Sequence, residues 1–321
     1  MTRPSAVPPP VTAVLDASSR WLPAHLGEVE DLLRKQSEGY GEVLGTDATA
    51  TLGAGGKRLR PLLVLLCAGV EGDERAVRAA AAIELVHMAT LVHDDVLDDA
   101  PLRRGLPTIA ATAGRARATA LGDLLFSRAF ALLAGHRQGR EAELLAGASV
   151  ALARGELAQR QDAFDLAISE ERYLDRCRLK TAALFECACR LGRDERALGE
   201  FGARIGLAFQ LLDDVLDVSG PAERTGKARG TDLLDGTVTL PLVLAARHDV
   251  DLGEVDLRSL DPAAAEALCD RIAATGALEQ VRERALAMVA AAKQDLGSGA
   301  FDPEQRRLLE LVADGVVQRY S

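Results

Sequence analysis

Long blocks of helix-forming residues constrain the fold of this 321-residue chain more than any other feature. No segment alternates β-branched and polar residues for long enough to predict a strand, and no Asn-Gly pair marks a hairpin. Helical blocks are expected at 76–99, 116–134, 141–163, 170–191, 195–218, 238–247, 262–275 and 277–296. The sequence therefore predicts an all-α protein.

The composition supports this fold class. Aromatic residues make up only 3% of the chain, so Ala, Leu and Val must fill the core, which favours helices over sheets. A hydrophobic share of 48% with 27% charged residues excludes a wholly disordered chain. The formal net charge of −10 argues against a nucleic-acid partner, because no basic face is available for a phosphate backbone.

Domain boundaries are sparse. The Pro-rich start lacks the apolar core of a signal peptide, so residues 1–10 are expected to form a disordered tail. No linker rich in Pro, Gly or Ser divides the remainder, which predicts one domain over residues 11–321. The longest apolar run, 61–70, is about half the roughly 20 residues that span a bilayer, so no transmembrane segment is predicted.

The five cysteines indicate a reducing compartment. Their number is odd, and Cys187 and Cys189 are not at zinc-ribbon or thioredoxin spacing. We expect all five to be reduced, buried thiols in a cytoplasmic protein.

A five-residue motif, DDVLD, occurs twice, at 94–98 and 213–217. On a helix the first and last Asp of each copy are four residues apart and share a face. Because like charges at this spacing repel, a cation must compensate them. Carboxylate oxygens suit Mg²⁺, which takes one or two carboxylates and leaves positions for water and phosphate. The motifs therefore predict two magnesium-binding segments.

Basic residues accompany these carboxylates. A Gly pair precedes Lys57, Arg58 and Arg60, so that the backbone can approach an anion closely. Further cations on the chain are Arg103, Arg104, Lys180 and Lys227. Arginine forks match phosphate oxygens bidentately, so together the cations predict a diphosphate site that faces the metal site. The Gly- and Thr-rich break at 219–236 suits a mobile flap.

These motifs make the chain resemble the trans-isoprenyl diphosphate synthases, the polyprenyl synthetase enzymes. The resemblance runs from Gly53 to Pro241 through GGKRLRP, ELVHMATLVHDDVLDDAPLRRG, Gly122-Asp123, KTAALF, FQLLDDVLD and GKARGTDLLDGTVTLP. It implies a bundle of long antiparallel helices around a deep central cleft, and usually a homodimer.

The resemblance also implies a reaction. An allylic diphosphate loses its diphosphate, and isopentenyl diphosphate attacks the resulting cation. Mg²⁺, three ions per active site, is expected on both sides of the leaving diphosphate. The implied metal ligands are Asp94, Asp95 and Asp98 on one side and Asp213, Asp214 and Asp217 on the other.

Substrate contacts follow from the same resemblance. Arg103, Lys180 and Lys227 match the contacts to the allylic diphosphate, whereas Lys57, Arg60, His87 and Arg104, with Arg58 as a helper, match those to isopentenyl diphosphate. Thr181 and Gln210 are expected to stabilise the developing cation through their dipoles. The final proton is expected to go to the departing diphosphate, so no side chain is assigned as general base.

Other residues near the motifs receive weaker interpretations. His93 is expected to be structural and Asp99 to be solvated, while Asp123 is expected to orient a cation or to cap a helix. Arg319, near the carboxyl end of the sequence, is a candidate to close over a diphosphate. Many family members carry Lys where this chain has Thr237, which removes one donor from the flap.

Small side chains near the first motif predict a long product. The prenyl chain is expected to grow past Thr90 and Ala89, which precede Asp94 by four and five residues, with Val86 and Ile83 as later walls. In short-chain family members aromatic residues at this place form a floor. The hypothesis is a product longer than farnesyl, in the hexaprenyl to decaprenyl range, with geranylgeranyl as the main alternative.

Three other functions remain open. A class I terpene cyclase would need neither GGKRLRP nor a second DDxxD motif, and a head-to-head condensing enzyme would bind two allylic substrates. The third alternative is a subunit of a hetero-oligomeric synthase, favoured mainly by Thr237.

Transient membrane contact during release of a lipid product is also expected.

Overall fold

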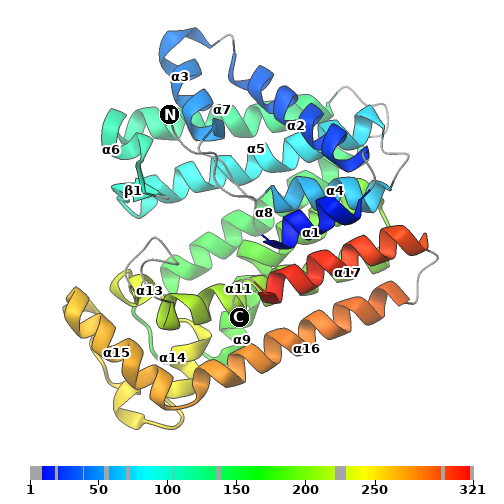
Figure 1. The fold of residues 1–321 in the computed structure, drawn as a ribbon. Coiled ribbons are helices and arrows are strands. Elements are labelled where there is room, and N and C mark those ends of the chain that lie inside the picture. Colours follow the sequence, from blue (N-terminus) through cyan, green and yellow to red (C-terminus); the bar gives the residue numbers. More distant parts are fainter. Residues whose placement is uncertain are drawn as a thin grey trace. The chain divides into compact units, whose positions relative to one another are not determined.

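Helices account for nearly all regular structure in the computed structural model (Figure 1). The structure describes residues 9–18, 21–38, 40–53, 58–69, 73–103, 105–134, 139–220, 229–297 and 301–318. Within these residues the strands are β1 (Leu102–Arg103) and β2 (Leu106–Pro107), which form one antiparallel pair. The predicted all-α class is confirmed.

Contacts within the chain group it into two compact units. The first comprises residues 1–149, 187–199 and 299–315, and the second comprises 150–186, 200–298 and 316–321. Neither unit is a continuous stretch of sequence, which explains why no Pro- or Gly-rich linker marks the division. The single domain over 11–321 stays a prediction.

The amino-terminal expectation needs one correction. Helix α1 (Pro9–Ala17) begins at Pro9, so the last two residues of the expected tail are helical. Proline is tolerated in the first turn of a helix, where its missing N–H would have no intrahelical partner. Residues 1–8 lie outside the described residues.

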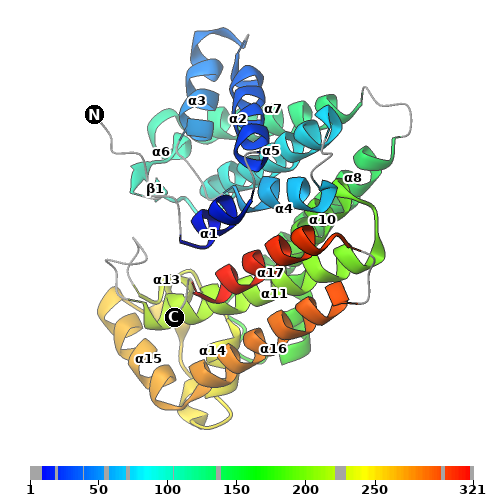
Figure 2. The same ribbon diagram turned by 45° about the vertical axis from the view of Figure 1, so that its right-hand side comes forward.

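A long buried helix, α5, forms the core of the first unit. The helices of this unit are α1, α2 (Trp21–Ser37), α3 (Gly41–Gly53), α4 (Leu59–Ala68), α5 (Glu74–Leu97), α6 (Ile109–Ala113) and α7 (Arg115–Leu133). Helices α2, α4 and α7 all contact α5, and α7 lies beside it in Figures 1 and 2. The run 79–82 consists of four fully buried alanines, whose small side chains allow neighbouring helices to approach closely.

Helix α5 also has the length and apolar composition of a membrane span. It is the one helix among the described residues that passes this test, and 72% of its apolar stretch is buried inside the protein. That degree of burial is typical of a core helix in a globular protein.

The five cysteines are free and buried, as expected.

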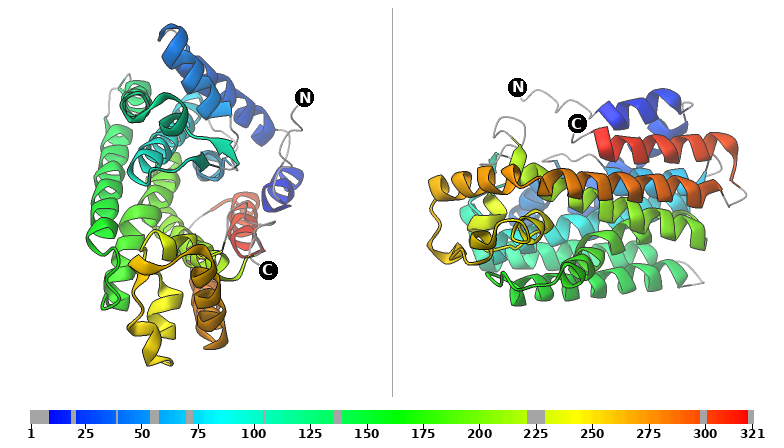
Figure 3. Two further views of the ribbon diagram at one scale, coloured as in Figure 1. Left: turned by 90° about the vertical axis from the view of Figure 1, so that its left-hand side faces the viewer. Right: turned by 90° about the horizontal axis from the view of Figure 1, so that it is seen from below.

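The second unit also consists mainly of helices. Its elements include α9 (Glu170–Cys177), η1 (Arg178–Ala182), α13 (Thr231–Leu234), α14 (Leu240–Ala245), η2 (Val250–Gly253), η3 (Leu257–Ser259), α15 (Pro262–Ala274) and α16 (Ala277–Gly297). Four helices contribute residues to both units: α8 (Arg140–Gln161), α10 (Ala183–Gly192), α11 (Arg196–Ser219) and α17 (Pro303–Gln318). Helices α14 and α15 both contact α16, which Figures 2 and 3 show as one long helix.

The predicted helical blocks end within two residues of the observed helices. One difference lies inside the block predicted at 170–191, where the π-helix η1 interrupts the α-helical path at residues 178–182. Intrinsic propensity does not distinguish a π-turn from an α-turn, because both use the same helix-forming residues.

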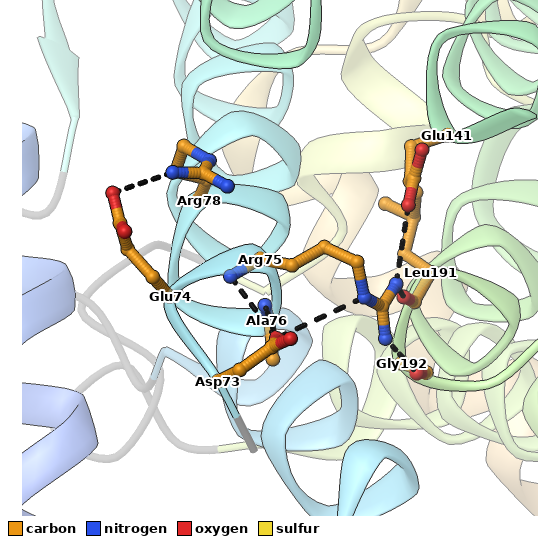
Figure 4. Close-up of polar contacts among 8 residues, drawn as sticks. All are labelled: Asp73, Glu74, Arg75, Ala76, Arg78, Glu141, Leu191 and Gly192. Atoms are coloured by element: carbon orange, nitrogen blue, oxygen red, sulfur yellow. Dashed lines mark hydrogen bonds and ion pairs between the residues drawn. The ribbon is translucent and has the colours of Figure 1, made fainter. Parts of the chain in front are cut away.

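One arginine at the start of α5 secures the end of α10 (Figure 4). Arg75 Nη1 donates to the Leu191 carbonyl at 3.0 Å, and Nη2 donates to the Gly192 carbonyl at 2.8 Å. Nη1 also pairs with Glu141 Oε1 at 3.2 Å. The last carbonyls of a helix have no intrahelical partner, so Arg75 supplies the donors that the end of α10 requires.

Removing this side chain should destabilise the protein. We expect Arg75→Ala to lower the free energy of unfolding by about 1 to 3 kcal/mol, since two carbonyls and one carboxylate lose their donor. Arg306→Ala on α17 is a matched control because Arg306 pairs only across its own exposed helix surface with Glu310 in the contacts described. Urea titrations of both variants measure the difference, and equal losses would contradict the proposed role of Arg75.

Candidate functional site

The first DDVLD motif lies at the carboxyl end of α5. Asp98 is the C-cap, and its backbone N–H donates to the Asp94 carbonyl at 2.8 Å. Asp94 is half-buried and Asp98 is exposed, whereas only 6% of Asp95 is exposed. The outer two carboxylates therefore lie on the accessible face that their four-residue spacing predicts, and the middle one points inward.

Arg103 compensates the buried middle carboxylate. Its Nε donates to Asp95 Oδ1 at 2.6 Å. Arg103 is placed by the β1–β2 pair, whose turn contains Gly105 with a φ of +76°. The hydroxyl of Thr108 donates to the Ala100 carbonyl at 2.7 Å and closes this loop. Sequence reasoning missed the hairpin because its strands are two residues each, but it did expect a cation near the motif.

The neighbours of the motif are fixed by packing. His93 stacks on Phe126, with ring centroids 5.8 Å apart, and its Nε2 lies 3.4 Å from Asp123 Oδ1. A Cβ at Gly122 would lie 2.2 Å from that Nε2, so only glycine leaves space for the imidazole. The structural expectation for His93 is confirmed. Asp123 lies within α7 and caps no helix there, so that alternative is wrong.

Asp99 lies on the surface beside the first motif. Its carboxylate forms an ion pair with Arg115, and 80% of its side chain is exposed. The expectation that Asp99 is solvated is confirmed.

The second DDVLD motif repeats the arrangement of the first on α11. Asp213 is exposed and Asp217 is half-buried, whereas only 2% of Asp214 is exposed. Asp217 Oδ2 accepts a hydrogen bond from the backbone N–H of Asp232 at 3.2 Å. Both motifs thus offer an outer pair of carboxylates and turn the middle carboxylate into their own unit.

Neutral donors, not a cation, hold the middle carboxyl of the second motif. Tyr173 Oη donates to Asp214 Oδ2 at 2.5 Å, and Gln210 Nε2 donates to Asp214 Oδ1 at 2.7 Å. Burial raises the pKa of Asp214 to about 8, the charge of Asp232 adds to the increase, and the two hydrogen bonds oppose it. Both oxygens of Asp214 therefore serve contacts within the protein, which argues against its expected role as a metal ligand.

The hydrogen-bond chain continues to the π-helix. Thr181 Oγ1 donates to Gln210 Oε1 at 2.7 Å, so Thr181 and Gln210 are brought together as the resemblance implied. Lys180 precedes Thr181 in η1, and its Nζ lies 2.5 Å from Glu156 Oε2 on α8. Although burial raises the pKa of Glu156, the charges of Lys180 and Arg160 lower it overall.

Two glycines allow the π-helix to fit between its neighbours. A Cβ at Gly155 of α8 would lie 2.5 Å from the Lys180 backbone nitrogen, and one at Gly206 of α11 would lie 2.8 Å from the Ala182 Cα. Real Cβ atoms do not approach this closely, so both positions require glycine at this backbone spacing. Because π-turns often occur at functional positions, η1 is included in the candidate site.

The basic segment before α4 is built around a buried carboxylate. Arg58 Nη1 donates to Glu84 Oε1 at 2.8 Å, while its Nε donates to Glu30 Oε1 at 2.6 Å. Its Nη2 also donates to the Leu52 carbonyl at 2.9 Å. Burial opposes a charge on Arg58, but its bonds to Glu30 and Glu84 raise the pKa overall. These contacts give Arg58 a structural role, and its role as a helper at isopentenyl diphosphate stays a prediction.

Arg60 differs from Arg58 in its electrostatic surroundings. Burial lowers the pKa of Arg60 to about 10, and the charge of Glu84 opposes this decrease. Glu84, with 2% of its surface exposed, thus acts on both arginines.

The residues expected to control product length differ in accessibility. Val86 and Ala89 are completely buried, as is Ile83, whereas Thr90 is half-buried. Thr90 Oγ1 donates back to the carbonyl of His87 at 2.7 Å, and His87 is also half-buried. Of these positions on α5, Thr90 has accessible surface one turn before Asp94.

Four expected residues lie outside the described part of the chain: Lys57, Arg104, Lys227 and Arg319. The segment 221–228 of the expected flap also lies there. Thr237 is described, and its backbone N–H donates to the Asp232 carbonyl at 2.7 Å.

The outer carboxylates suit a hard divalent cation. Within the described residues no group of three or more His, Cys, Asp or Glu side chains is arranged to hold a metal ion by itself. Mg²⁺ does not require such a group, because it binds through one or two carboxylates and completes its shell with water and phosphate oxygens. The pair Asp94 and Asp98, and the pair Asp213 and Asp217, fit that requirement.

Sequence reasoning missed three residues that organise the site. Glu84 had a detectable signal, since it is a lone charge in the apolar run AAAAIELVHMA. Glu156 and Tyr173 had none, because their partners Lys180 and Asp214 are distant in sequence.

The Arg58 network yields a stability prediction. Arg58→Ala should lower the free energy of unfolding by about 3 kcal/mol, because Glu84 would remain buried without its closest cation. Arg58→Lys should lose less, since it keeps the charge. Arg34→Ala is the control, as Arg34 and Asp31 are each 63% exposed. Chemical denaturation measures all three, and a fully stable Arg58→Ala variant would contradict the assignment.

Known proteins are similar in sequence to this chain over most of its length. The chain is 43% identical over 243 residues to heptaprenyl diphosphate synthase component 2 of Geobacillus stearothermophilus, which covers 72% of this chain and 75% of that protein. It is 34% identical over 286 residues to the geranylgeranyl diphosphate synthase of Methanosarcina mazei, covering 83% and 86%.

A solved structure agrees with these relatives. The crystal structure of a polyprenyl synthase from Caulobacter crescentus, complexed with calcium and isoprenyl diphosphate, matches with a TM-score of 0.90 and 34% identity over 99% of this chain and 100% of that one. The family description polyprenyl synthetase matches residues 42–260, which include both DDVLD motifs, the basic segment and η1. Since the match covers every motif of the candidate site, the chain belongs to the polyprenyl synthetase family of prenyltransferases.

Proposed function

We propose that this protein joins isopentenyl diphosphate to an allylic diphosphate in a head-to-tail (1'–4) condensation. The product is an all-trans polyprenyl diphosphate longer than farnesyl diphosphate. The observation that carries the proposal is the pair of DDVLD motifs, each of which presents two outer carboxylates from a helix that is otherwise packed in a core.

The outer carboxylates are the proposed Mg²⁺ ligands: Asp94, Asp98, Asp213 and Asp217. Bound Mg²⁺, three ions per active site, would neutralise the leaving diphosphate. Arg103, Lys180 and Lys227 contact that diphosphate, while Lys57, Arg60, His87 and Arg104 bind isopentenyl diphosphate. Thr181 and Gln210 direct dipoles at the allylic cation as its charge develops.

Product length is proposed from the residues before Asp94. Thr90 has accessible surface and a small side chain, which leaves space for a growing prenyl chain. The relatives include both a heptaprenyl and a geranylgeranyl synthase, so geranylgeranyl diphosphate remains the alternative product.

The assembly is proposed to be a cytoplasmic homodimer. Val150 and Leu157 lie seven residues apart on α8, and they are 60% and 63% exposed. Residues at this spacing share a helix face, and exposed apolar side chains of this size suit an interface. A subunit of a hetero-oligomeric synthase is the alternative, favoured because one relative is named as a component.

The function is tested by product analysis. Purified full-length protein is incubated with Mg²⁺, radiolabelled isopentenyl diphosphate and dimethylallyl, geranyl, farnesyl or geranylgeranyl diphosphate in turn. The products are dephosphorylated and sized by chromatography. We expect one discrete product longer than farnesol and no product after chelation of Mg²⁺.

Two variants separate the outer from the middle carboxylates. Asp213→Asn should lower kcat about 100-fold and raise the Mg²⁺ concentration for half-maximal activity. Asp214→Asn should leave the Mg²⁺ concentration for half-maximal activity near the wild-type value, since the oxygens of Asp214 face Tyr173 and Gln210. Folded wild-type protein that binds isopentenyl diphosphate but makes no product would favour the subunit alternative.

Product length has its own test. Thr90→Phe should shorten the product, because an aromatic ring would occupy the accessible space one turn before Asp94. Thr90→Val keeps the size of the side chain and should leave the product unchanged. Ala89→Phe should instead lower the melting temperature, because Ala89 is fully buried and overpacking costs about 1 to 3 kcal/mol. An unchanged product from a folded Thr90→Phe enzyme would contradict the length hypothesis.

A further inference from the structure

Four side chains of the second unit form one continuous hydrogen-bond chain. It runs from Tyr173 Oη to Asp214 Oδ2, from Asp214 Oδ1 to Gln210 Nε2, and from Gln210 Oε1 to Thr181 Oγ1, with donor–acceptor distances of 2.5, 2.7 and 2.7 Å. Tyr173 and Asp214 are almost completely buried, at 1% and 2% exposure, and Thr181 is 8% exposed. Water therefore competes little for these bonds.

This chain of hydrogen bonds determines which way the Gln210 amide points. A carboxyl oxygen that accepts a hydrogen bond attracts the NH₂ group and disfavours the carbonyl, so Asp214 Oδ1 holds Nε2 on its side. The amide oxygen then faces Thr181 and accepts the only hydroxyl proton of that residue. Thr181 is left with lone pairs and no proton for any other contact.

This proton placement matters beside a carbocation. An oxygen that presents lone pairs attracts positive charge, whereas one that presents its proton repels it. If the amide were reversed, Nε2 would face Thr181, and the threonine proton would turn outward. The sign of the dipole at Thr181 thus depends on the orientation of Asp214.

Tyr173 sets that orientation. A single bond from Gln210 would allow the Asp214 carboxyl to rotate, but the bond from Tyr173 Oη fixes the second oxygen. The ring of Tyr173 is itself held, because the Arg176 guanidinium lies 5.4 Å from its centroid and Arg176 Nη2 donates to the Val238 carbonyl at 2.6 Å.

We propose that Tyr173 is a positioning residue for prenyl transfer, acting through Asp214 and Gln210 to keep the lone pairs of Thr181 directed at the allylic cation. The inference rests on the proposed function and adds two roles to it. Tyr173 touches no substrate, and Asp214 orients a dipole instead of binding a metal ion.

The test is Tyr173→Phe in the full-length enzyme, with kcat and KM measured for both substrates. We expect kcat to fall about 10-fold while both KM values stay within about threefold, because the affected dipole acts on the developing cation and not on the bound diphosphates. Tyr40→Phe is the matched control, since Tyr40 lies in the first unit against Arg128. A Tyr173→Phe enzyme with wild-type kcat would overturn the proposal.

A double-mutant cycle excludes a merely structural effect. If Tyr173 acts through Thr181, Thr181→Val with Tyr173→Phe should be no slower than Thr181→Val alone, whereas independent roles would multiply. Additive losses would overturn the proposal. Should Tyr173→Phe not fold, Gln210→Glu reverses the polarity that faces Asp214, and wild-type kcat in that variant would overturn it equally. An inactive wild-type enzyme would instead count against the proposed function.

Discussion

The repulsion among three carboxylates at the end of a buried helix is the constraint from which the rest of the site follows. Two of the three can face outward, four residues apart, but the middle one must enter the protein. A buried carboxyl requires donors for both the charge and the lone pairs. Asp95 and Asp214 therefore dictate which residues lie around them, and those residues in turn shape the site.

The two motifs meet this constraint in different ways. Asp95 has the guanidinium of Arg103 as its partner, and the β1–β2 hairpin places Arg103 beside it. Among the described residues Asp214 has the neutral donors Tyr173 and Gln210, which satisfy its oxygens but bring no opposite charge. Burial outweighs these two hydrogen bonds, so the pKa of Asp214 is raised to about 8. Identical pentapeptides thus acquire different chemistry from residues far away in the sequence.

The different partners of Asp95 and Asp214 could not be predicted from the sequence. The helices and the outward pairs of carboxylates follow from local spacing, which a sequence displays directly. The structural role of Arg58 does not, because its partners Glu30 and Glu84 come from two other helices. The π-turn at Lys180 was also out of reach, since it depends on the close approach that Gly155 and Gly206 allow from α8 and α11.

In this chain of net charge −10, three of the described cations that were expected to bind diphosphate are paired with carboxylates. Arg58, Arg103 and Lys180 each have a carboxylate partner already in the protein: Glu84, Asp95 and Glu156. A partly buried cation without a partner would be costly before substrate arrives. With these partners the local charge is close to balanced, so the cations alone supply little net attraction for a diphosphate. Divalent ions, held by the outward carboxylates as proposed, would then supply most of the positive charge that a diphosphate requires, and those carboxylates would not compete for the arginines.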